Sequence, residues 1–106
     1  MLFRHGNVLI QQVSELPNHA RLVAKPVLAY GETTGHSHRI EDPHKVALWD
    51  AAAGLFLQVF EPTFVVHEEH QPIALPVGIY KVWQQREYMP PNQRWIDSID
   101  FNMMLD

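Results

Sequence analysis

The sequence predicts an all-β protein, a single small barrel or β-sandwich of about eight strands that spans residues 1–106 as one domain. Three observations support this fold class. The apolar runs are short, have the length of strands, and are rich in β-branched and aromatic residues. Turn residues separate these runs at intervals of about ten residues, which is typical of sandwiches and barrels. The chain of 106 residues is long enough for one well-buried core and too short for two.

The expected strands follow one another with turn residues between them. In chain order they cover residues 7–13, 20–25, 26–33, a segment around 36–38, 45–50, 55–60, 63–67 and 78–88. The eight prolines interrupt none of these runs for long, which favours strand ends and edges over helices. We expect the aromatic residues of the middle runs in the core, namely Trp49, Phe56, Phe60 and Phe64. In the tail, Trp95, Ile99 and Met103 follow helical spacing, so a short C-terminal helix could form there.

Composition and charge exclude several classes of function. A net charge of −4 has the wrong sign for a phosphate-binding surface, so we expect no nucleic-acid partner. The chain has no cysteine, which rules out disulfides, thiolate nucleophiles and cysteine zinc sites. No stretch approaches the ~18–20 apolar residues of a membrane span, and no signal sequence is recognisable. The expected location is therefore the cytoplasm, without a membrane partner.

Histidines are the residues that point to a functional site. Five of the seven, beginning with His36 and His38, fall within 35 positions. Side chains two apart on a strand share a face, so His36 and His38 can converge on one ion. Further ligands are offered by His67 and His70, provided that the turn-like HQP segment bends the chain and brings both to one side. These four histidines predict a site for a divalent transition metal, first Zn or Ni and next Fe or Mn, which imidazole binds without discriminating among them.

Other interpretations of the histidines stay open. The pairs could lie on a solvated strand, or line a metal-free ligand pocket. The sequence HEEH is not the zinc-protease motif HExxH, because its histidines are three apart and the preceding TFVV favours a strand. His5, His19 and His44 are expected at the surface.

The glycine and histidine spacing resembles the cupins, small double-stranded β-helix barrels. Gly31, His36, His38 and Asp42, with Glu41 adjacent, look like a shortened form of the first cupin motif, and Pro76 and Gly78 match part of the second. Lys81 stands where the histidine of the second cupin motif would be. The resemblance implies a barrel in which two strands separate the HxH strand from the P-x-G turn. It makes His67 or His70 the replacement ligand.

A closer resemblance covers most of the chain. GHSHR at 35–39 and HEEHQPIALPVGIYKVWQQREYMP at 67–90 are similar to a pattern found in a family of small uncharacterised bacterial proteins. This resemblance implies no activity.

Three classes of function remain. The histidine site could belong to a metal enzyme, or to a module that only binds a small molecule. A structural or assembly protein without a site is the third class. No general base can be assigned, although Glu69 and Glu87 are the nearest candidates, so whether the protein is an enzyme stays open. The tail from residue 94 to 106 holds seven apolar residues in thirteen, which predicts self-association, most simply as a dimer.

Overall fold

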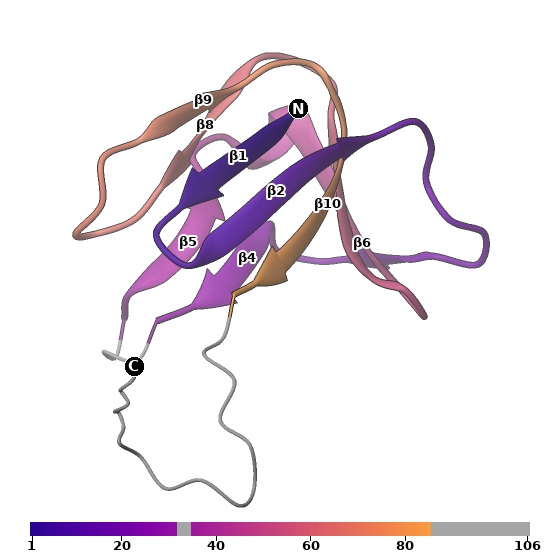
Figure 1. Ribbon diagram of the computed structural model, residues 1–106, viewed down its shortest axis with the longest axis horizontal. Helices are drawn as coiled ribbons and strands as arrows, with labels where there is room; N and C mark the ends of the chain where they lie inside the picture. Colours follow the sequence, from indigo (N-terminus) through magenta and orange to yellow (C-terminus); the bar gives the residue numbers. More distant parts are fainter. Residues whose placement is uncertain (32–34, 86–106) are drawn as a thin grey trace, which may run out of the picture.

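The computed structural model describes residues 1–31 and 35–85, and these form a β-sandwich rather than a closed barrel. The all-β fold class is therefore confirmed, with ten strands in the described part (Figure 1). The strands are β1 (Leu2–His5), β2 (Val8–Val13), β3 (Arg21–Val23), β4 (Val27–Tyr30), β5 (Ser37–Ile40), β6 (Val46–Ala51), β7 (Gly54–Val59), β8 (Thr63–Val66), β9 (Ile73–Leu75) and β10 (Gly78–Gln84). A 3₁₀ turn, η1 (Pro43–Lys45), precedes β6. No helix in the described ranges is long and apolar enough to cross a membrane.

One sheet has six strands in the order β1-β2-β10-β7-β6-β3. Its two tight hairpins, β1–β2 and β6–β7, are separated in the sheet by β10, which pairs antiparallel with both β2 and β7. Strand β10 thus joins the N-terminal hairpin to the rest of the sheet, and the end of β10 runs towards the histidines described below.

The second sheet has four antiparallel strands in the order β4-β5-β8-β9. Strand β5 lies between β4 and β8, with Arg39 opposite Val66 and Ile40 opposite Val65. In Figure 1 the turn of the β1–β2 hairpin lies beside β5, so an end of each sheet contributes to the same region of the molecule.

The core lies between the two sheets and draws on both. Its largest fully buried side chains include Ile10 and Tyr80 from the six-stranded sheet and Val65 and Leu75 from the four-stranded sheet. The hydroxyl group of Tyr80 donates a hydrogen bond to the Pro76 carbonyl at 2.8 Å, which satisfies the polar end of this buried ring. The Pro76 turn at the start of β10 is therefore tied to the core.

Two expectations about the aromatic residues were wrong. Phe56 is buried as predicted and Trp49 is partly buried, but the side chains of Phe60 and Phe64 are 53% and 46% exposed. Phe60 lies just beyond the end of β7, and Phe64 alternates with the buried residues Thr63 and Val65 along β8. The period of two along β8 therefore overrides the hydrophobicity of Phe64, because adjacent residues of a strand face opposite sides.

The strand order expected from the cupin resemblance was also wrong. Four strands, β6 to β9, lie between the HxH strand β5 and the P-x-G turn at 76–78, where two were expected. Strands β1 and β9 were not recognised in the sequence, because each is short and starts or ends beside turn residues. The expected tail helix lies outside the described residues.

Candidate metal centre

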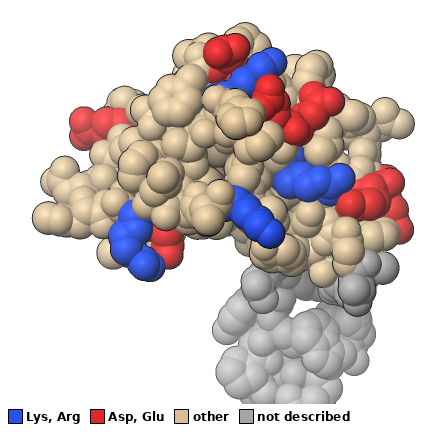
Figure 2. Space-filling model, turned by 180° about the vertical axis from the view of Figure 1, so that it is seen from behind, with Lys and Arg blue, Asp and Glu red and all other residues tan. Residues whose placement is uncertain are grey.

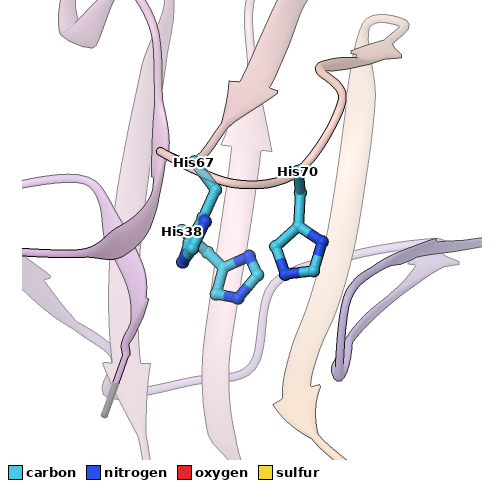
Figure 3. Close-up of side chains that lie close together, drawn as sticks. All are labelled: His38, His67 and His70. Atoms are coloured by element: carbon cyan, nitrogen blue, oxygen red, sulfur yellow. The ribbon is translucent and has the colours of Figure 1, made fainter. Parts of the chain in front are cut away.

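Three of the four predicted histidines form a compact group. Ligand nitrogens of His38, His67 and His70 all lie within 4.8 Å of one another (Figure 3). Tetrahedral zinc sites with Zn–N bonds of about 2.0–2.1 Å place their ligand nitrogens about 3.3 Å apart. The rings would therefore need to approach one another by about 1.5 Å at most to hold such an ion, a shift that rotation about side-chain bonds can supply.

The strand register brings His38 and His67 together. Arg39 pairs with Val66, so one further step along the antiparallel register puts His67 opposite His38 and on the same face. Directly opposite side chains on that face lie about 4.5–5.5 Å apart at their Cβ atoms. The ring centroids of His38 and His67 are 4.4 Å apart, in agreement with this register.

A bend after β8 brings in the third histidine. The chain leaves the strand at Val66 and bends through residues 68–70, so His70 does not continue the alternation that would turn it away from His67. The ring centroids of His67 and His70 are 4.7 Å apart, and the His70 ring stacks on His38 at 5.3 Å. The bend that the sequence required for these two histidines to meet is therefore present.

Glu68 fastens this bend to β5. Its carboxylate accepts a hydrogen bond from the Ser37 N–H at 3.0 Å and pairs with the Arg39 guanidinium at 2.9 Å. The hydrogen bond from Ser37 is the main reason that the pKa of Glu68 lies below its usual value, with the Arg39 charge acting in the same direction. These contacts hold the segment between His67 and His70 against the strand that carries His38.

His5, expected at the surface, is instead a buried member of the cluster. Its side chain is 2% exposed, and its ring centroid lies 4.9 Å from that of His38 and 5.5 Å from that of His70. His5 ends β1, where it shares a face with the partly buried Phe3. This alternation in LFRH, followed by the turn residues Gly6-Asn7, was the signal in the sequence that could have placed His5 inside.

Burial keeps the two innermost histidines neutral at physiological pH. Desolvation lowers the pKa of His38 to about 4, and the neighbouring His67, His5 and His70 act in the same direction while Glu68 opposes them. Desolvation is likewise the main cause that lowers the pKa of His5. Neutral imidazole is the form that binds a metal ion.

His67 would have to change its hydrogen bonding to bind a metal ion through Nε2. Its Nδ1 accepts a hydrogen bond from the Glu69 N–H at 3.0 Å, so the neutral ring carries its proton on Nε2. Binding an ion through Nε2 would move that proton to Nδ1 and break the contact with Glu69. Because this hydrogen bond is exposed, water can replace it at little cost.

His36 does not belong to the group that His38 forms with His67 and His70. It precedes β5 and belongs to a second group, with His67 and Glu68, whose ligand atoms also lie within 4.8 Å of one another. Its Nδ1 is 3.6 Å from a carboxylate oxygen of Glu69. His36 and His38 thus line the same pocket, and His67 belongs to both groups.

A pocket of about 480 Å³ adjoins the histidines. Apart from four histidines it is lined by Gly6, Asn7, Tyr30, Gly31, Glu69 and Gln84. Asn7, Tyr30 and Gln84 provide neutral hydrogen-bonding groups, and Glu69 provides a carboxylate. Sequence reasoning missed Asn7, Tyr30 and Gln84, because the hairpin turn, the end of β4 and the end of β10 lie beside the histidines only in the folded protein. Of the candidate bases, Glu69 lines this pocket, whereas Glu87 lies outside the described residues.

Asp42 and Gly31, the other residues singled out by the cupin resemblance, lie at two different places in the fold. The Asp42 carboxylate caps the 3₁₀ turn by accepting a hydrogen bond from the His44 N–H, and it joins neither histidine group. Gly31 lines the pocket, and its N–H donates to the His36 carbonyl. His19 and His44 are exposed, as expected.

On the face in Figure 2 basic and acidic side chains are intermixed, so neither sign of charge gathers into one patch there.

Gly6 leaves room for the histidine rings at the tip of the β1–β2 hairpin. Its φ of +62° fits the first position of a two-residue hairpin turn, where glycine is preferred. A Cβ atom at this position would lie 2.9 Å from both His38 Cε1 and His70 Nε2. The turn therefore needs glycine for its backbone and also for the space beside the rings.

Gly6→Ala is expected to lower the free energy of unfolding by about 1–3 kcal/mol more than Gly35→Ala, because overpacking adds to the backbone strain. Gly35 is a matched control: its φ is +85°, and a Cβ there meets no described atom within 4 Å. Urea denaturation of chelator-treated protein measures both losses. Equal losses would mean that the hairpin tip does not press on the histidines.

Comparison with known proteins gives the family. A search of curated proteins and a search of solved structures each found no match to the chain. A family model described as a domain of unknown function (DUF8820) matches residues 4–85, a range that includes His5, the HxH strand and the bend after β8. We conclude that the chain belongs to this uncharacterised domain family.

Proposed function

We propose that this protein binds one divalent transition metal ion through His38, His67 and His70, beside a pocket that takes a small polar ligand. The observation that carries the proposal is the convergence of three ring nitrogens within 4.8 Å, from two chain segments that pair in one sheet. Zn or Ni is the expected ion and Fe or Mn the next, since the ligand set is imidazole with carboxylates nearby.

The chemistry of such a site follows from its number of ligands. Three histidines leave a coordination position for water or a ligand when the metal is four-coordinate, as in catalytic zinc sites. The bound metal would supply Lewis acidity. Asn7, Tyr30 and Gln84 line the pocket and carry polar groups suited to orient a neutral polar ligand, while Glu69 is the lining residue whose carboxylate would accept a proton.

The two overlapping ligand groups predict different mutational effects. If the ion lies among the three histidines, His70→Ala should weaken zinc affinity by more than about 100-fold, beyond the ~10–100-fold effect of outer partners. Glu68→Gln should weaken it by about tenfold or less, because glutamine can still accept the hydrogen bond from Ser37 and hold the bend. Calorimetric titration of tag-free protein with Zn²⁺ measures both affinities.

The reverse order would contradict this assignment. Should Glu68→Gln and His36→Ala each lower the zinc affinity more than His70→Ala does, the ion belongs to the group formed by His36, His67 and Glu68. His44→Ala, at an exposed histidine that belongs to neither group, controls for non-specific binding to surface imidazole.

A further inference from the structure

His5 is not a member of either ligand group, yet it makes one buried and one part-buried hydrogen bond at the centre of the cluster. Its Nε2 lies 2.9 Å from the Gln71 carbonyl oxygen, and its Nδ1 lies 2.8 Å from His38 Nδ1. The two rings are nearly perpendicular, with an interplanar angle of 84°. The side chains of His5 and His38 are almost completely buried, so water competes little for the contact between the two rings.

The carbonyl group at one end of this chain of hydrogen bonds determines where the protons lie. A carbonyl oxygen only accepts, so His5 Nε2 must carry the hydrogen that it donates to Gln71. A neutral imidazole has one donor and one acceptor nitrogen, and His5 Nδ1 is therefore the acceptor. His38 Nδ1 must then be the donor in the contact between the two rings. The remaining nitrogen of His38, Nε2, is left with its lone pair available.

We infer that His5 is a positioning residue that holds His38 as the Nδ1–H tautomer, so that His38 presents Nε2 to a metal ion. This inference rests on the proposed metal site. Metal-binding histidines generally donate their second ring N–H to a carbonyl, a carboxylate or water, which fixes ring orientation and tautomer. Here another histidine accepts that hydrogen and is itself oriented by a backbone carbonyl.

The anchor of this hydrogen-bond chain belongs to the loop that carries two of the ligands. Gln71 directly follows His70, and its carbonyl is the group that orients His5. His5 therefore connects the hairpin tip of the six-stranded sheet to both β5 and the bend after β8. A displacement of the bend would move the acceptor on which the His38 tautomer depends.

The tautomer can be measured without a metal ion. Full-length protein with ¹⁵N-labelled histidine, stripped with a chelator and held near neutral pH, should show a protonated Nδ1 and an unprotonated Nε2 for His38. His5 should show the opposite pattern. A His38 ring protonated at Nε2 would overturn the inference. This result does not depend on whether any metal binds, so it separates the inference from the proposed function.

Two substitutions at His5 test its positioning role. His5→Phe keeps a ring but removes the acceptor, and should weaken zinc affinity by about 10–100-fold, the range for outer partners of metal ligands. His5→Asn keeps an acceptor oxygen near the place of Nδ1 and should restore both the His38 tautomer and an affinity close to that of the wild type. The positioning role would be contradicted if His5→Asn restored neither the His38 tautomer nor the zinc affinity. An unchanged zinc affinity of His5→Phe would also contradict it.

Cadmium distinguishes a positioning residue from a ligand. With ¹¹³Cd²⁺ bound to the ¹⁵N-labelled protein, scalar coupling should connect the metal to His38 Nε2 and not to either nitrogen of His5. Coupling to His5 Nδ1 would make His5 a ligand and overturn the inference. Zinc titration of the wild type, which tests the proposed function, is read separately from these spectra.

Discussion

Wild-type protein is expected to gain about 2.7 kcal/mol of unfolding free energy when free Zn²⁺ is 100 times its dissociation constant, whereas a His38→Ala/His67→Ala variant should gain none. An ion that binds only the folded state stabilises it by mass action, and this variant lacks two of the three ligands. Urea denaturation with chelator and with zinc measures the gain for each protein.

A matched control variant removes the same number of histidines as the test variant. His19→Asn/His44→Ala also removes two imidazoles, but at exposed positions outside both ligand groups. Asparagine is used at residue 19 because φ there is +61°, a conformation that asparagine tolerates better than most residues. This control should keep the full gain. An equal gain in the His38→Ala/His67→Ala variant would place the stabilising ion elsewhere.

Chelator-treated protein should lose stability as the pH falls from about 6.5 to about 4. The pKa of His38 is about 4 in the folded state and near 6.5 in the unfolded chain, so the unfolded state binds more protons within this window. The free energy of unfolding should then fall by on the order of 1 kcal/mol per pH unit because of His38 alone. His5, whose pKa is also lowered by burial, adds to the loss.

The groups around His38 support the direction of this pH effect. His5, His67 and His70 face its ring and disfavour its positive charge, while Glu68 acts in the opposite direction and more weakly than burial. Urea denaturation at several pH values measures the slope. A His5→Phe/His38→Leu variant should show a much shallower slope, because both buried titrating groups are removed. A wild-type stability that does not change between pH 6.5 and 4.5 would contradict buried neutral imidazoles.

The sequence predicted the fold class and most strands because their signal is local. Runs such as VLIQQV and GLFLQV hold alternating or continuous apolar residues between turn residues, and each forms a strand close to its expected position. Strand order is not a local property: β10 pairs with β2, far away in the chain, and the described strands divide into two separate sheets, which makes the fold a sandwich.

For the candidate site, too, the sequence predicted what depends on local spacing and did not predict what depends on contacts between distant segments. Spacing alone indicated that His36 and His38 approach one region and that His67 and His70 need a bend to meet. It could not show that the register of β5 with β8 puts His67 opposite His38, nor that the N-terminal hairpin brings His5 onto them. The alternation in LFRH could have indicated that His5 points inward, but its contact with the other histidines follows only from how the hairpin packs on the second sheet.

Metal content per chain tests the central claim most directly. Protein without a polyhistidine tag, produced with Zn, Ni, Fe and Mn all available and then freed of loosely bound ions, should contain close to one transition-metal ion per chain by elemental analysis. The His38→Ala/His67→Ala variant, prepared in parallel, should contain almost none, while the His19→Asn/His44→Ala control should match the wild type. Wild-type protein with no more metal than the His38→Ala/His67→Ala variant would contradict the claim that these histidines form a metal centre.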